Sequence, residues 1–175
     1  MNLRLLRAEC LAKLNDVELP APFELTDFCE RLGHRRQRPI HLRPVALPEG
    51  SPSGVLVSTA AADYVFYPAN TTPLHQEHIV LHEVGHLLWD HAAGHTVGED
   101  TFRRLLPALD LPAVQCILGR AGCTGLEEQQ AELTATLILG KVAAWSPAAP
   151  RTVPASHAAT IGRLRQTLEH PGHGH

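Results

Sequence analysis

The chain has 175 residues, of which 44% are hydrophobic and 19% are charged, and its formal net charge is −3. This length suits one domain, and this apolar content excludes a wholly disordered chain. The negative net charge argues against a nucleic-acid binder that depends on overall attraction to phosphates, and no apolar run approaches the ~18–20 residues of a membrane span.

The first third of the chain predicts two helices. Residues 2–15 carry apolar side chains at helical spacing, at Leu3, Leu6, Cys10, Leu11 and Leu14. Charged residues interrupt this run and no small-residue cleavage site follows it, so we interpret it as an amphipathic helix and not as a signal peptide. Residues 24–34 predict a second, short helix. The basic run His34–Arg38 follows, and we interpret it as a solvated loop.

The next stretches predict strands. Residues 40–47 alternate in part, and residues 54–59 and 63–68 are rich in β-branched and aromatic side chains. The short connection Ala60–Ala62 between the last two favours a hairpin.

Helices are predicted again in the second half. Thr72 followed by Pro73 is typical of an N-cap and first helical position, so a long helix is expected from Pro73 to about Ala93. Thr124 and Glu127 form a capping-box pattern that opens a helix running to Trp145.

Between and after these helices the pattern is weaker. Pro107 and Pro112 allow only short helices, which we place at Thr101–Leu106 and Ala113–Leu118. Residues 156–169 predict a last amphipathic helix. We therefore expect a single domain of residues 1–169 and a disordered, His-rich tail of residues 170–175.

The chain contains 12 histidines, and two of them belong to a short motif that is typical of metal sites. His82-Glu83-Val84-Gly85-His86 is an H-E-x-x-H motif. Positions i and i+4 lie on one helical face, so both imidazoles reach one Zn²⁺. Glu83, about 100° around the helix, suits a catalytic base that does not ligate the metal. Gly85 is a poor helix former, which makes sense if another backbone packs closely there.

The alternative to a metal site is a core helix with two hydrogen-bonded histidines. A hydrolytic zinc site also needs a third protein ligand. The extended motif with a third histidine is excluded because Trp89 and Ala92 stand where it requires Gly and His. Glu128 and Glu132, four residues apart, share a helical face. One can ligate zinc while the other accepts a hydrogen bond from a ligating histidine. Alternatively, both only complement the helix dipole.

Two stretches resemble the ImmA/IrrE-type metallopeptidases, zincins whose third ligand is glutamate. They are IVLHEVGHLLWDH and EEQQAELTATLIL, within a looser match from Tyr64 to Leu139. Gln130 stands where the family usually has Glu, and Glu132 where Asn or Asp is common. The resemblance implies these site residues: zinc ligands His82, His86 and Glu128, catalytic base Glu83, and Glu132 in the outer shell.

The resemblance also implies a function. It is that of a zinc-dependent, cytoplasmic endopeptidase that cleaves or regulates a partner helix-turn-helix transcriptional repressor. Such hydrolysis also needs an oxyanion stabiliser. The sequence leaves several candidates open for that role: Tyr64, Tyr67, His75, His78, His91 and His95.

The expected fold is α+β and zincin-like. A small, mostly antiparallel sheet from residues 40–67 packs on the two motif helices, with extra helices at both ends. The four cysteines are expected to be reduced thiols, with Cys116 and Cys123 buried.

Two other functions compete with the peptidase. The first is a non-catalytic, zinc-containing binding module that regulates a DNA-binding partner by association. The second is direct DNA binding through His34–Arg38, which predicts a strongly salt-dependent affinity. We rank DNA binding last, because the chain has no room for a separate helix-turn-helix domain beside a zincin core.

Overall fold

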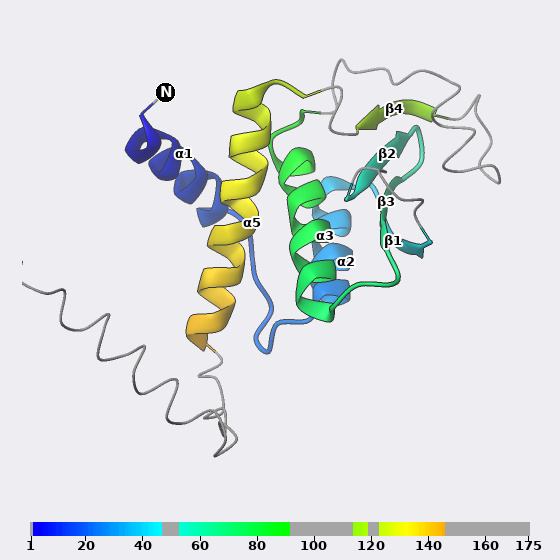
Figure 1. Ribbon diagram of the computed structural model, residues 1–175, viewed down its shortest axis with the longest axis horizontal. Coiled ribbons are helices and arrows are strands. Elements are labelled where there is room, and N and C mark those ends of the chain that lie inside the picture. The colour runs from blue at the N-terminus through cyan, green and yellow to red at the C-terminus, as the bar shows by residue number, and fades with distance from the viewer. Residues whose placement is uncertain (1, 47–52, 92–113, 119–122, 146–175) are drawn as a thin grey trace, which may run out of the picture. The chain divides into compact units, whose positions relative to one another are not determined.

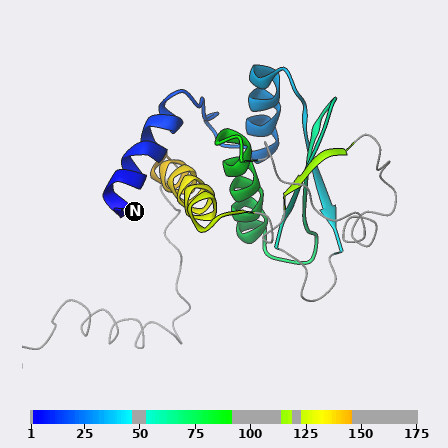
Figure 2. The ribbon, with the colours of Figure 1, turned by 90° about the horizontal axis from the view of Figure 1, so that it is seen from above.

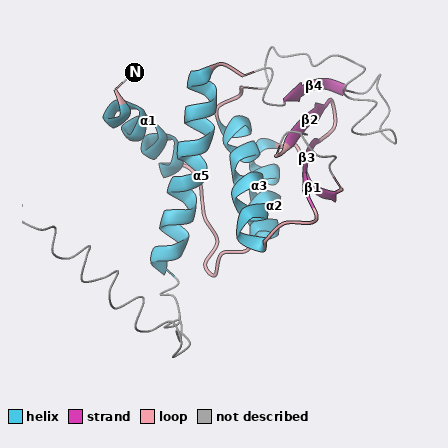
Figure 3. Ribbon diagram, viewed as in Figure 1, coloured by secondary structure: helices cyan, strands magenta, loops and turns pink. Residues whose placement is uncertain are grey.

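A computed structural model describes residues 2–46, 53–91, 114–118 and 123–145 (Figure 1). Helices and strands lie in separate parts of this fold (Figure 3), which is therefore of the α+β class. The elements follow in the order α1 (Leu3–Asn15), α2 (Leu25–Arg36), β1 (Ile40–Val45), β2 (Val55–Thr59), β3 (Asp63–Pro68), α3 (Pro73–Leu88), β4 (Val114–Leu118) and α5 (Gly125–Trp145). The predicted helices at 101–106 and 156–169 and the tail 170–175 lie outside the described residues.

The sheet has the strand order β1-β3-β2-β4. Strand β2 pairs antiparallel with both β3 and β4, whereas β1 runs parallel to β3 with Ile40 opposite Asp63. The hairpin predicted between β2 and β3 is confirmed. Its turn is closed by the Thr59 hydroxyl, which accepts from the backbone N–H of Ala62 and donates to the carbonyl of the same residue.

The helix predicted at Ala113–Leu118 is wrong, because Val114–Leu118 forms strand β4 against β2. The segment reads Val-Gln-Cys-Ile-Leu, which suits a strand as well as a short helix. The edge of β2 supplies backbone partners that a helix of this length would have to find within itself. Pairing with a strand more than 50 residues earlier therefore decides the structure here.

The helices stack on one side of the sheet in two tiers (Figure 2). In the tier nearest the sheet, α2 packs against β1 and α3 against β3; in the next, α5 packs against α3 and α1 against α5. One apolar core runs through helices α1, α2, α3 and α5 and strands β1 to β3. Its largest fully buried side chains include Phe28, Leu6, Leu14, Leu81 and Ile138. None of the helices in the described part of the chain has the length and apolar character needed to cross a membrane.

Helix α3 begins where the sequence predicts but ends earlier. The Thr72 side chain accepts from the His75 N–H, and Pro73 occupies the first turn. The predicted extension to Ala93 is wrong, because the helix stops at Leu88 and Asp90 adopts a left-handed φ of 55°. The N–H of His91 then bonds back to the carbonyl of His86 at 3.0 Å. This is a Schellman-type ending, with aspartate in the position that glycine usually takes.

The basic run after α2 is also different from its prediction. Arg36 completes α2, and the next residue, Gln37, has a left-handed φ of 55°. The Arg38 Nε lies 3.1 Å from a carboxylate oxygen of Asp63, a residue only 1% exposed, and Arg36 lies 4.0 Å from the other oxygen. Arg36 also donates to the carbonyl of Leu87 at 2.9 Å. The interpretation as a solvated loop is therefore wrong for these two arginines. They connect the C-terminal end of α2 with Asp63 of β3 and with the last turn of α3.

Candidate metal centre

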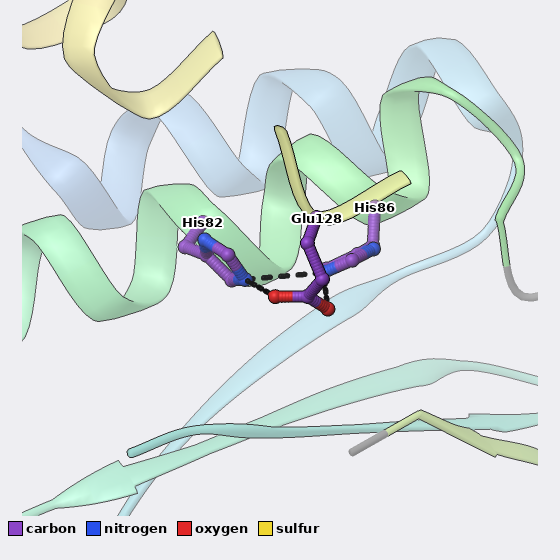
Figure 4. A group of neighbouring side chains, drawn as sticks. All are labelled: His82, His86 and Glu128. Atoms are coloured by element: carbon purple, nitrogen blue, oxygen red, sulfur yellow. Dashed lines mark hydrogen bonds and ion pairs between the residues drawn. The ribbon is translucent and has the colours of Figure 1, made fainter. Parts of the chain in front are cut away.

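His82, His86 and Glu128 point toward one another from α3 and α5 (Figure 4). Their ligand atoms all lie within 4.8 Å of one another. The two Nε2 atoms are 3.1 Å apart, and each lies 3.5 Å from an oxygen of the Glu128 carboxylate. Two segments more than 40 residues apart in the chain thus present three metal-ligating groups to one point.

Local structure on both helices sets this arrangement. On α5, the predicted capping box is confirmed, because the Glu127 carboxylate accepts from the Thr124 N–H at 2.7 Å and fixes the first turn beside Glu128. On α3, the predicted close approach at Gly85 is also confirmed. A Cβ there would lie 2.9 Å from the Cα of Ala131 and 3.0 Å from its carbonyl oxygen. Glycine therefore lets α5 come near enough for its carboxylate to reach the histidines.

The donor set fits a zinc ion. Two ligand atoms at ~2.0–2.1 Å from a tetrahedral metal are about 3.3 Å apart. The two Nε2 atoms are 3.1 Å apart, and each lies 3.5 Å from a different oxygen of the Glu128 carboxylate. Two imidazoles and one carboxylate are also a donor set of catalytic zinc sites. The His86 side chain is 3% exposed and that of Glu128 is 30% exposed, so the group is buried on one side and accessible on the other.

The outer nitrogen of His82 faces Glu132. The Nδ1 atom lies 3.3 Å from one oxygen of this carboxylate, and the other oxygen lies 3.1 Å from Nε2 of His78. A carboxylate only accepts hydrogen bonds, so Nδ1 of a neutral His82 carries the proton and Nε2 offers its lone pair. The sequence predicts that one of Glu128 and Glu132 accepts a hydrogen bond from a ligating histidine, and Glu132 makes this contact.

The outer nitrogen of His86, Nδ1, faces His91. His91 Nδ1 lies 2.9 Å from His86 Nδ1, and His91 Nε2 lies 3.0 Å from the amide oxygen of Gln130. Burial lowers the pKa of His91, which favours a neutral ring. His91 was an oxyanion candidate, but this contact places it behind His86. Neither the contact of His91 with His86 nor that of Gln130 with His91 was predicted.

A pocket of about 180 Å³ opens beside His82, and Glu83 lines it. The Glu83 residue is 5% exposed. A Cβ added at Gly54, just before β2, would overlap its carboxylate and lie 2.8 Å from Cγ2 of Ile79. Gly54 therefore gives the predicted base its place, a requirement that the sequence analysis missed. The remaining lining residues are Ser53, His75, His78, Ile79 and Glu132.

Tyr64 and Tyr67 do not line this pocket. Tyr64 stacks on the strand surface between His41 and Phe66, with ring centroids 5.1 and 6.4 Å away. Tyr67 packs against the hydrophobic core. His95 lies outside the described residues. Among the candidates that the structure describes, His75 and His78 are thus the two beside Glu83.

Cys123 is a further neighbour that the sequence analysis did not place at the site. Its Sγ lies 3.7 Å from His86 Nδ1. Burial, together with the nearby Glu128 carboxylate, raises the pKa of the Cys123 thiol to about 12. The side chain is therefore a thiol, as expected, although it is only half-buried; that of Cys116 is not described.

Comparisons with protein-family models, with characterised proteins and with solved structures find no match for this chain.

Proposed function

We propose that this protein is a zinc-dependent peptidase whose metal is held by His82, His86 and Glu128. The observation that carries the proposal is the convergence of these side chains, since the two Nε2 atoms are 3.1 Å apart and each lies 3.5 Å from one oxygen of the Glu128 carboxylate. A hydrogen-bonded cluster explains this less well. With Nδ1 of a neutral His82 donating to Glu132, its Nε2 and the Glu128 carboxylate are both acceptors, and two acceptors at 3.5 Å repel unless a cation lies between them.

The position of Glu83 favours catalysis over a purely structural site. Zinc supplies a Lewis acid that polarises a carbonyl and acidifies water. Glu83, held against Gly54 at the wall of the pocket that His82 also lines, takes the proton of the attacking water and returns it to the leaving amine. A structural zinc site has no need of a buried carboxylate in this place.

The class of substrate comes from the motif resemblance. The ImmA/IrrE-type zincins act on helix-turn-helix regulators, which supports a repressor of that kind as the protein substrate and the cytoplasm as the place of action. The competing function is a zinc-containing binding module that regulates such a partner by association alone.

Replacement of the base separates these two functions. We expect the wild-type protein to purify with zinc and to cleave fluorescence-quenched peptides of mixed sequence. Glu83→Gln should keep its zinc, measured by atomic emission, and lose cleavage by at least about 100-fold, the lower range for a general base. Glu77→Gln, on the same helix but outside the pocket lining, is the matched control and should keep both.

The outcome in cells completes the test. If regulation of the partner survives Glu83→Gln, the binding module is the function and the peptidase proposal is wrong. If the wild-type protein binds no zinc at micromolar concentration, both functions are contradicted.

A further inference from the structure

His86 is backed by a chain of two further side chains, His91 and Gln130. We infer that these two residues form a positioning relay, which keeps the proton of His86 on Nδ1 and leaves Nε2 as the metal ligand. The inference depends on the proposed metal centre and assigns it outer partners that lie on two different elements.

The backbone brings His91 to this place. The left-handed Asp90 turns the chain at the end of α3, and the N–H of His91 bonds to the carbonyl of His86 at 3.0 Å. The side chain is then folded back on the preceding turn, where the two rings meet edge to face with centroids 5.1 Å apart. His91 is only 7% exposed, so water does not easily replace its hydrogen-bond partners.

The hydrogens of the relay can be assigned from its end. The Gln130 amide oxygen, 3.0 Å from His91 Nε2, accepts a hydrogen bond, so Nε2 carries the proton of a neutral His91. His91 Nδ1 is then an acceptor, and the only hydrogen for the 2.9 Å contact comes from Nδ1 of His86. A neutral His86 with its proton on Nδ1 presents a lone pair at Nε2, the atom that faces His82 and Glu128.

The relay matters because the two histidines, taken without Gln130, also allow the opposite arrangement. If His91 carried its proton on Nδ1, it would donate to His86, and the proton of His86 would lie on Nε2. That proton would point at His82 Nε2, 3.1 Å away, and would have to be displaced before a metal binds. An acceptor at position 130 selects the first arrangement. The second histidine needs no such selection, because the Glu132 carboxylate beside His82 Nδ1 is only an acceptor.

Two substitutions at one position test the relay. Gln130→Leu removes the acceptor at nearly constant volume, and Gln130→Glu keeps an acceptor there. Gln129→Leu is the matched control, because Gln129 is the same residue type, one place earlier on α5, and exposed. Outer partners of metal ligands typically contribute 10- to 100-fold in metal affinity, so Gln130→Leu should bind zinc about 10- to 100-fold more weakly in competition with a chromogenic chelator. Gln130→Glu and Gln129→Leu should stay within about threefold of the wild type.

Imidazole ¹⁵N spectra of the zinc-loaded wild-type protein give a readout that needs no variant to fold. They should show a protonated Nδ1 on His86 and, on His91, a protonated Nε2 with an unprotonated Nδ1. A proton on His91 Nδ1, or a wild-type zinc affinity in a folded Gln130→Leu protein, would overturn the relay and leave the metal centre intact. A wild-type protein that binds no zinc would overturn both.

Discussion

The two imidazoles of the candidate metal centre have opposite surroundings. Behind His86 lie His91, which is 7% exposed, and the amide of Gln130, and neither carries a charge. Behind His82 lies Glu132, whose side chain is 57% exposed and which also contacts His78. A pocket opens on this second side, and Glu132 lines it.

We call the surroundings of His86 the buried end of the metal centre and the surroundings of His82 its open end. The difference predicts that the two ends affect different properties of the site. At the buried end, few waters compete for the hydrogen bonds, so side chains there control the affinity for the metal. At the open end, water replaces lost contacts and screens charge, so substitutions there change the affinity less. The pocket with Glu83 lies on the open side.

The largest effect is expected from the ligands that join the two ends. His86→Ala and Glu128→Ala each remove one of three donors and should weaken zinc binding by more than the ~100-fold upper value for outer partners. Metal content after dialysis against a chelator measures this, with Glu77→Ala as the control on α3. Full zinc occupancy in Glu128→Ala would show that the third ligand is another residue.

The next effect concerns the close contact of α3 with α5. Gly85→Ala places a Cβ 2.9 Å from the Cα of Ala131. Because the backbone of a packed helix cannot easily move away, we expect the free energy of unfolding to fall by about 1–3 kcal/mol. Zinc affinity should fall with it, since α5 carries Glu128. Gly140→Ala on α5 is the control: its Cβ meets nothing within 4 Å, so the helix should gain up to about 1 kcal/mol. Urea unfolding of the metal-free proteins compares the two, and equal stabilities would contradict the close packing.

A third substitution acts on the open side alone. Gly54→Ala directs a Cβ at the Glu83 carboxylate and at Ile79, so the base must move. Because small displacements of catalytic groups are costly, peptide cleavage should fall about 10- to 100-fold while zinc affinity stays at the wild-type value. Gly125→Ala, which has open space at its Cβ, should change neither. An equal loss of zinc and activity in Gly54→Ala would show that the two ends are not separate.

Elements whose signals are local could be predicted from the sequence. Helices α1 and α2, the β2–β3 hairpin and the Thr124 capping box all follow from spacing, turn and cap residues within a few positions. Strand β4 could not be predicted, since its partner β2 is distant in sequence. The early end of α3 was missed because aspartate, and not glycine, takes the left-handed position at residue 90.

The candidate site divides in the same way. The helical spacing of His82 and His86 brings them together, and helical spacing also offers Glu128 and Glu132 as a pair. The contact of His91 with His86 could not be predicted, because it depends on how α3 ends. The spacing of the ligands in the sequence does not indicate where the helix ends.

The smallest effect is expected from Glu132, at the open end. Glu132→Gln replaces the carboxylate with an amide whose oxygen still accepts from His82 Nδ1, and it removes the charge of a side chain that is more than half exposed. Water screens that charge, so zinc affinity should fall by about 10-fold or less, at the lower end for outer partners and less than in Gln130→Leu. The same chelator competition measures both variants. If Glu132→Gln loses zinc as completely as Glu128→Ala does, Glu132 is a ligand and the open end controls the metal. If it weakens zinc more than Gln130→Leu while still binding it, charge and not burial decides which outer partner matters, and the comparison of the two ends must be reversed.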